Sequence, residues 1–186
     1  MSSTLLLSPL LSVEQCRDYV TEADLICAAD YSPRRAAEYL TWRAVLNRHL
    51  GSVHSICYDS AGAPSILGSS LHIGVSHTVD LISVVVSDAH CAVDVERKDR
   101  DVARISSRFL TTEERSLCHR NEELVALWCA RECYYKLRRD PSLSMLDHIR
   151  VKSLDIAAGV VVVVDNRSES ATFTILETDD HFVVYL

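Results

Sequence analysis

The spacing of apolar residues predicts two long helices. Residues 32–50 place apolar side chains along one side of a helix, with Pro33 at the first helical position and Gly51 just after the last turn. Residues 121–138 show a second amphipathic pattern, which ends shortly before Pro141. We expect each helix to pack one face against a core.

Alternating and β-branched segments fill much of the remaining chain. Residues 65–87 predict two strands joined near Ser76, His77 and Thr78, and residues 90–97 predict another short strand. Three more strands are predicted near the C-terminus, in the segments "AGVVVVVDN", "ATFTILET" and "HFVVYL". Mixed runs of strands and helices favour an α+β fold over a regular βαβ array.

The composition indicates a folded protein that is not a general nucleic-acid binder. Of 186 residues, 48% are hydrophobic and only 5 are Gly and 4 are Pro, which argues against extensive disorder. The formal net charge of -7 disfavours a protein whose affinity comes from neutralising the phosphates of a nucleic acid. Local basic patches are still expected because several arginines cluster in the sequence.

The seven cysteines show neither a disulfide framework nor a metal-binding spacing. Their number is odd and no Cys-x-x-Cys pair occurs, so we expect reduced, buried thiols in a cytoplasmic protein. The apolar start of the chain lacks a basic segment and is interrupted by Pro9, so no signal peptide is expected. No apolar stretch approaches the roughly 20 residues needed to span a membrane.

Three carboxylates carry the candidate chemistry. In "VDVE" (residues 93–96), strand alternation places Asp94 and Glu96 on one face and the two valines toward the core. Two carboxylates so close repel each other unless a cation lies between them. Glu132 lies on the second helix, on an edge that also carries Lys136. As a third ligand it would complete an all-oxygen site of the kind that Mg²⁺ prefers.

Each element also has a simpler interpretation. The two strand carboxylates would fit the solvated face of an edge strand, paired with Arg97 or Lys98. Glu132 and Lys136 stand in the order favoured for an ordinary i,i+4 salt bridge on a helix surface. Trp128, one turn earlier, is expected to pack in the core.

A resemblance that covers most of the chain favours the catalytic interpretation. "AVDVE", a spacer and "WCARECYYK" resemble the paired signature of the 4'-phosphopantetheinyl transferase superfamily. "SHT", "RRAAEYLTWR" and "RFLTTEE" resemble, in the right order, the family's Ser-His-Ser, its basic first helix and its Arg-Phe-Phe-x-x-x-Glu stretch. The last segment also predicts a capping box, in which Thr111 pairs with Glu114.

The resemblance implies two similar α+β halves related by a pseudo-twofold axis, as in the single-chain, surfactin-type group. The halves would be residues 1–91 and 92–186, with the active site at their junction. The implied enzyme is a Mg²⁺-dependent holo-[acyl-carrier-protein] synthase with coenzyme A as co-substrate. It would transfer the 4'-phosphopantetheine group to a serine of an apo acyl or peptidyl carrier protein and release 3',5'-ADP.

The resemblance also implies a role for each matching residue. Asp94, Glu96 and Glu132 would hold Mg²⁺ on the pyrophosphate of coenzyme A. Glu132, directly or through a water, would accept the proton of the attacking serine, and Lys136 would neutralise the departing 3',5'-ADP. The residues implied to bind coenzyme A are Arg34, Arg35, Ser76, His77 and Lys136. By base rate, the histidine would be structural and the two arginines plain surface charges, although cations are unfavourable at a helix N-terminus.

Three residues depart from the family pattern. Ala92 replaces a glycine, Arg131 replaces a lysine, and Ala63 stands where a basic contact to phosphate is expected. Loss of that contact would raise KM without abolishing the chemistry. The second hypothesis is therefore a catalytically degenerate relative that binds a carrier protein or a coenzyme A derivative without turnover. Retention of the full acidic set favours the enzyme.

A basic surface is expected for the carrier protein. Carrier proteins are typically acidic, so an acidic enzyme needs a basic docking face to avoid repulsion. The candidates follow the acidic strand and are Arg97, Lys98, Arg100, Arg104 and Arg108, with Arg138 and Arg139 as an extension. The alternative is an ordinary solvated surface of mixed charge.

Overall fold

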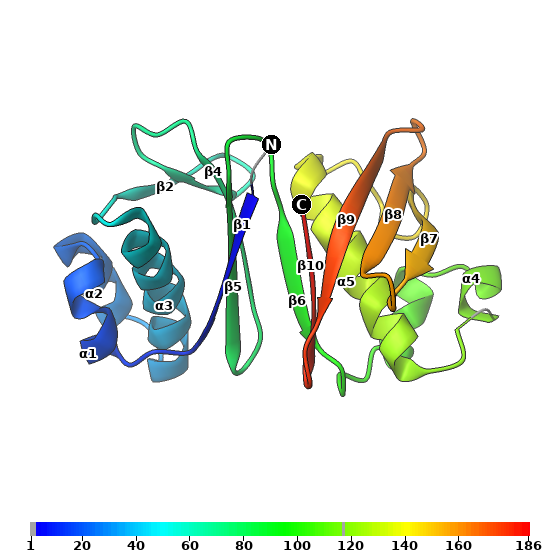
Figure 1. Ribbon diagram of the computed structural model, residues 1–186, viewed down its shortest axis with the longest axis horizontal. Helices are drawn as coiled ribbons and strands as arrows, with labels where there is room; N and C mark the ends of the chain where they lie inside the picture. The colour runs from blue at the N-terminus through cyan, green and yellow to red at the C-terminus, as the bar shows by residue number, and fades with distance from the viewer. Residues whose placement is uncertain (1–2, 117) are drawn as a thin grey trace. The chain divides into compact units, whose positions relative to one another are not determined.

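The computed structural model describes residues 3–116 and 118–186 (Figure 1). The chain divides into two compact units, Met1–Cys91 and Ala92–Leu186. Each unit combines helices with one five-stranded sheet whose neighbouring strands are antiparallel. The predicted α+β fold is therefore confirmed.

In the first unit the longest helix, α3, packs on strands β1 and β5. The sheet has the strand order β1-β5-β4-β3-β2. The elements of this unit are β1 (Ser3–Pro9), α1 (Val13–Cys16), η1 (Arg17–Tyr19), α2 (Glu22–Ala29), α3 (Pro33–Leu50), β2 (Ile56–Tyr58), β3 (Pro64–Ile66), β4 (His72–His77) and β5 (Leu81–Ser87).

In the second unit the longest helix, α5, packs on strands β6 and β10 (Figure 1). The sheet has the strand order β6-β10-β9-β8-β7. The elements of this unit are β6 (Val93–Arg97), η2 (Ala103–Arg108), α4 (Thr112–Ser116), α5 (Asn121–Arg138), β7 (Ile149–Asp155), β8 (Val160–Asp165), β9 (Ser170–Glu177) and β10 (His181–Tyr185).

The two units share one topology. Each begins with a strand, continues through short helices to one helix of 18 residues, and ends with four strands. In each sheet the first strand pairs with the last, and the other strands follow in reverse order. The chain thus contains two similar halves, while the pseudo-twofold axis between them stays a prediction.

A fully buried arginine occupies the same place in each long helix. Arg43 is the eleventh residue of α3, and Arg131 is the eleventh residue of α5. Arg43 pairs with Asp24 of α2 at 2.9 Å, and Arg131 pairs with Glu114 of α4. Each guanidinium therefore ties a long helix to a shorter helix that precedes it.

Both long helices have the predicted bounds. Ser32 caps the N-terminus of α3, and Gly51 ends it with a φ of 74°, a conformation that glycine adopts without strain. The start of α5 is fixed by Glu123, whose carboxylate accepts the backbone N–H groups of His119 at 2.8 Å and Arg120 at 3.3 Å. Local capping chemistry explains why these boundaries were predictable.

The sequence pattern misses four strands, β1, β2, β3 and β7. Strand β1 runs through the apolar start of the chain and pairs with β5 along its whole length. Strands β2 and β3 have three residues each, too few for an alternation to be recognised. Strand β7 has an irregular register between Val151 and Ser153, and such a bulge breaks the alternation.

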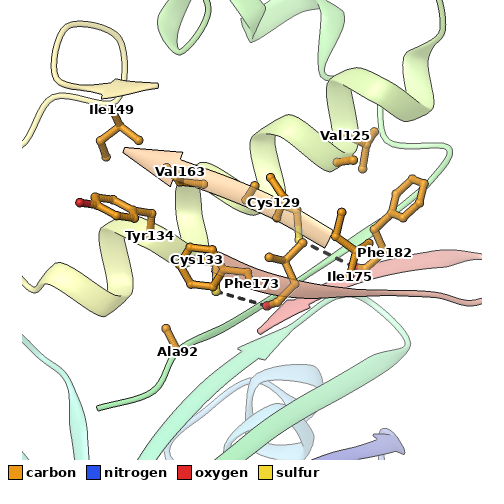
Figure 2. Packing of buried hydrophobic residues seen from close by; sticks show 14 of the residues in the cluster. Ala92, Val125, Cys129, Cys133, Tyr134, Ile149, Val163, Phe173, Ile175 and Phe182 are labelled. Atoms are coloured by element: carbon orange, nitrogen blue, oxygen red, sulfur yellow. Dashed lines mark hydrogen bonds between the residues drawn. The ribbon is translucent and has the colours of Figure 1, made fainter. Parts of the chain in front are cut away.

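The core of the second unit lies between α5 and the sheet (Figure 2). The thiol of Cys129 donates to the carbonyl of Phe182 at 3.8 Å, and that of Cys133 donates to the carbonyl of Val184 at 3.2 Å. Burial raises the pKa of the Cys129 thiol well above its ordinary value. Both side chains therefore act as small core residues that face β10.

All seven cysteines are free thiols, as predicted. The expectation that they are buried is wrong for Cys27 and Cys57, which are exposed, and for Cys118, which is partly exposed. Cys27 lies on the mostly exposed helix α2, and Cys57 lies on the short edge strand β2. Within the described ranges, no helix is both long and apolar enough to cross a membrane.

Candidate active site

Strand β6 directs two carboxylates to the face of the sheet that α5 covers. Asp94 lies opposite Val184 and Glu96 lies opposite Phe182 in the pairing with β10. Both of these β10 residues belong to the core that includes α5. The carboxylates are buried, with 4% and 9% of their surface exposed. Asp94 and Glu96 share one face, as predicted, but it is this face that is turned to the core beneath α5, and Val93 and Val95 lie on the opposite face. The expectation that the valines face this core and the interpretation as a solvated face are both wrong, because α5 covers the carboxylates.

Helix α5 faces these carboxylates with residues spaced four apart. Lys136 Nζ lies 2.6 Å from Asp94 Oδ1, and the indole N–H of Trp128 donates to Glu96 Oε1 at 2.8 Å. Glu132 lies one turn from each of them and is half-buried. Its carboxylate is close enough to both carboxylates of β6 to interact with their charges. Three residues of one helix edge thus converge on one strand.

The carboxylates oppose each other's ionisation. Burial raises the pKa of Glu96, and the charge of Asp94 raises it further, whereas Arg100 acts in the opposite direction. Burial also raises the pKa of Glu132; Asp94 adds to this effect, and Lys136 reduces it. A carboxylate whose pKa is raised in this way, such as that of Glu96 or Glu132, is stable in its ionised form only when a positive charge lies close by.

Two resident cations supply that charge. Burial alone would lower the pKa of Lys136, but the carboxylate of Asp94 raises it above the ordinary value, so the ammonium stays protonated. The guanidinium of Arg100 pairs with Glu96 and lies 5.4 Å from the ring centre of Trp128. Each carboxylate of β6 therefore has its own basic partner.

The donor set fits a hard divalent cation. Among the described residues, no three His, Cys, Asp or Glu side chains already enclose a position for a metal ion. Asp94, Glu96 and Glu132 nevertheless offer only oxygen donors from two adjoining elements, which suits Mg²⁺. A cation between them would also relieve the repulsion that raises two of their pKa values. These three residues would hold the metal.

The predicted partners of the strand carboxylates pair with other residues. Arg97 binds Asp99 through two contacts of 2.9 Å, and Lys98 binds Glu177 at 2.7 Å. Two further members of the predicted docking face are also ion-paired: Arg104 with Asp101 and Arg138 with Glu169. Most of the predicted basic face is therefore neutralised by acids of the same unit.

In the first unit, three of the residues predicted to bind coenzyme A lie close to one buried carboxylate, that of Glu38. Glu38 of α3 leaves only 8% of its side chain exposed. Arg34 Nε lies 3.0 Å from it, Arg35 Nη1 lies 3.4 Å from it, and His77 Nδ1 lies 3.8 Å from it. The two arginine side chains are more than half exposed, so this cluster presents positive charge to solvent around one buried acid.

Ser76 and Ala63 occupy the other two positions of this unit at which a contact to coenzyme A was considered. Ser76 is buried, and its carbonyl accepts the hydroxyl of Ser83 at 3.1 Å, beside His77 at the end of β4. Ala63 lies between β2 and β3, where its backbone N–H donates to Asp59 Oδ1 at 2.9 Å. Its methyl group supplies no charge, so this departure from the family pattern remains.

The other two departures are explained by packing. Arg131 binds Glu114 and the carbonyls of Met145 and Ile149, so its side chain is directed away from the carboxylates of β6. The predicted capping of α4 is present as well, because Glu114 accepts the backbone N–H of Thr111 at 2.9 Å. Ala92 belongs to the buried core beside α5. Neither substitution removes a group from the acidic site.

The sequence analysis did not predict the roles of three residues in these clusters, Trp128, Arg100 and Glu38. Trp128 lies four residues before Glu132, a spacing that identifies its helix face but not its hydrogen bond to the strand. Arg100 was expected to face a partner protein, and Glu38 was not singled out. The spacing of Glu38 from Arg34 and Arg35 on one helix is a local signal that could have identified it. The contact of Arg100 with Glu96 joins a loop to a strand, and the path of the loop decides it.

A buried acidic cluster beside a lysine is the kind of site that handles phosphate groups with the help of a divalent cation. The sequence profile of the 4'-phosphopantetheinyl transferase superfamily matches residues 90–184, which include β6 and α5 and make up just over half of the chain. The protein therefore belongs to the 4'-phosphopantetheinyl transferase superfamily. No curated protein matches the chain.

Proposed function

We propose that the protein transfers the 4'-phosphopantetheine group of coenzyme A to a serine of an apo acyl or peptidyl carrier protein. The serine oxygen attacks the β-phosphorus and forms a new O–P bond, while the bridging P–O bond to the nucleotide breaks. The products are the modified carrier protein and 3',5'-ADP. Membership of the superfamily supports this class of reaction.

The observation that carries the proposal is the meeting of Glu132 with Asp94 and Glu96. Helix α5 places the half-buried carboxylate of Glu132 between Trp128, which binds Glu96, and Lys136, which binds Asp94. The three negative charges repel one another unless positive charge lies close by. A protein that needed only a packed core would place apolar residues at these positions. Such a costly arrangement is typical of a functional site.

Each residue of this cluster has a role in the proposed reaction. Asp94, Glu96 and Glu132 would hold Mg²⁺, which would supply positive charge to the pyrophosphate. Glu132 accepts the proton of the serine hydroxyl, directly or through a water. Lys136, kept protonated by Asp94, stabilises the negative charge of the departing 3',5'-ADP.

The basic cluster of the first unit supports binding of coenzyme A. Arg34 and Arg35 present guanidinium groups that match phosphate geometry, and His77 and Ser76 lie at the adjoining end of β4. The carboxylate of Glu38 lies next to all three of these basic side chains and so holds them close together. We include these residues in the proposal as the site for the nucleotide phosphates.

The test is the mass of an apo acyl carrier protein incubated with this protein, coenzyme A and Mg²⁺. We expect a gain of one phosphopantetheine group, absent with a chelator and absent in a carrier protein whose acceptor serine is replaced by alanine. No gain with any of several carrier proteins, together with retained binding of coenzyme A in calorimetry, would reject the transferase and favour the non-catalytic relative.

A further inference from the structure

Arg100 forms an ion pair with Glu96, one of the three carboxylates that would bind a divalent cation. Its guanidinium pairs with Glu96 Oε1, the same oxygen that accepts the indole N–H of Trp128. The guanidinium also lies 5.4 Å from the centre of that indole ring, within the range of a cation–π contact. A positive side chain therefore already interacts with Glu96.

The backbone of Arg100 is fixed, whereas its side chain is accessible. The side-chain amide of Asn121, the first residue of α5, donates to the carbonyls of Lys98 at 3.1 Å and Arg100 at 3.0 Å. The side chain of Arg100 nevertheless leaves 41% of its surface exposed. The loop thus keeps the guanidinium within reach of Glu96, and solvent is available to accept it when it leaves.

The two resident cations differ in how easily they can be displaced. Lys136 is anchored by Asp94 and also by the carbonyl of Val93 at 3.3 Å, on a helix that packs on β6. Arg100 extends from a loop and is more exposed than Lys136. Arg100 is therefore the cation that a divalent ion displaces more readily, because its side chain can move into solvent while the ion takes its place as the positive charge beside Glu96.

We propose that Arg100 is a positioning residue that holds Glu96 while no divalent cation is bound and leaves it when a cation binds. This inference rests on the proposed function, because it assumes that Asp94, Glu96 and Glu132 take up a divalent ion. It adds a resident competitor to that site. Arg100 lowers the affinity for the cation through competition for Glu96 and through repulsion between like charges, and both effects have the same sign.

The test is a calorimetric titration of the full chain with Mn²⁺, in parallel for the wild type, Arg100→Ala and Arg104→Ala. We expect Arg100→Ala to bind Mn²⁺ about three- to tenfold more tightly, the scale of one nearby charge at a partly exposed site. Arg104 is the matched control because it is an exposed arginine of the same region that pairs with Asp101. Its removal should leave the affinity unchanged.

Thermal unfolding separates this role from simple structural support. In the presence of a chelator, Arg100→Ala should unfold at a lower temperature than the wild type, because Glu96 loses its basic partner. With saturating Mn²⁺ the difference should vanish or reverse. Arg100→Lys, which keeps the charge but not the planar group, should lie between the two.

The outcomes distinguish this inference from the proposed function. Wild-type binding of Mn²⁺ with no tighter binding by Arg100→Ala overturns the role of Arg100 and leaves the transferase proposal standing. Equal destabilisation of Arg100→Ala with chelator and with Mn²⁺ also overturns it. A wild-type protein that binds no Mn²⁺ at all overturns the cation site and, with it, both proposals.

Discussion

Trp128 packs edge to face on Phe109, with ring centroids 4.9 Å apart, and also donates its indole N–H to Glu96. The same side chain thus joins the apolar interior to the acidic cluster. Removing a side chain that orients a metal ligand typically lowers metal affinity or activity by about 10- to 100-fold. Trp128 is therefore more than a packing residue.

The substitution Trp128→Phe separates these two contributions. A phenylalanine ring keeps much of the aromatic packing but lacks the N–H that Glu96 accepts. We expect the free energy of unfolding to fall by about 1 kcal/mol, the usual contribution of one hydrogen bond. We expect kcat/KM to fall by about tenfold or more, because Glu96 is no longer oriented. Unchanged kcat/KM in a carrier-modification assay would contradict this role.

Glu132→Gln should stabilise the metal-free protein at neutral and alkaline pH. The folded state raises the pKa of Glu132 above its ordinary value of 4.5. The folded protein therefore binds a proton more tightly than the unfolded chain, and its stability falls as pH rises from about that value through the raised pKa. Glutamine does not ionise and avoids this loss.

The measurement is thermal unfolding in the presence of a chelator at pH 5 and pH 8. The gain from Glu132→Gln should be larger at pH 8. Glu122→Gln is the control, since Glu122 lies in the first turn of the same helix, ten residues before Glu132, and pairs with Arg120. An unfolding temperature of Glu132→Gln at or below that of the wild type at pH 8 would argue against repulsion in the cluster.

Helix α5 carries the site, so its start matters at the scale of the element. Glu123 accepts two backbone N–H groups and pairs with Arg120 at 3.1 Å. The hydrogen bond from the backbone of His119 is the main reason that the pKa of Glu123 is lowered. This carboxylate stabilises the folded state in its ionised form.

Glu123→Ala should lower the free energy of unfolding by about 1 kcal/mol at pH 7, the usual contribution of a helix cap. A lowered pKa means that this stabilisation is present above about pH 4.5 and is lost as pH falls through the value in the folded state. Urea unfolding at pH 7 and pH 3 measures both quantities. A difference that persists undiminished at pH 3 would show that the ionised carboxylate is not the cause.

The elements that the sequence predicts best are those whose ends are set by local chemistry. Helices α3 and α5 begin and end at predicted residues because caps, proline and glycine act within one turn. Strand β7, "IRVKSLD", is mostly polar, and its pairing with β8 is irregular. Its partner β8 is the next strand in the chain, but the bulge between Val151 and Ser153 interrupts the alternation by which the strand could have been recognised.

At the scale of the whole molecule, the same order of strands and helices occurs twice, each time with a buried arginine in the long helix. In the second unit Arg131 and Glu114 form a pair in which the arginine is fully buried. Removing one partner of such a pair leaves the other charge without compensation, which is more damaging than removing both.

Arg131→Met should therefore lower the free energy of unfolding by about 3–5 kcal/mol, whereas Arg131→Met combined with Glu114→Leu should cost less than the sum of the single changes. Urea unfolding of the single and double variants measures the coupling. Strict additivity would show that the two side chains do not depend on each other. Activity per folded molecule should change little, because Arg131 does not face the acidic cluster.

The order of motifs in the sequence was enough to predict the family and the α+β fold, but not the ion pair of Asp94 with Lys136. It was not enough to predict which cations hold the carboxylates before a metal binds. Arg100 was expected to face a partner, and it pairs with Glu96 because Asn121 anchors its loop. Contacts of this kind depend on the detailed path of a loop, which residue types alone do not determine.

The most direct test of the central claim, that Glu132 acts with the carboxylates of β6 in a cation-dependent transfer, is the rate at which a carrier protein gains phosphopantetheine. The rate is followed by mass spectrometry at saturating coenzyme A and Mg²⁺, with Glu132→Gln and Glu122→Gln compared at equal folded concentration. We predict a rate for Glu132→Gln at least about a hundredfold below that of the wild type, the range for loss of a general base. Glu122→Gln should retain the wild-type rate. Equal rates for wild type and Glu132→Gln would contradict the account.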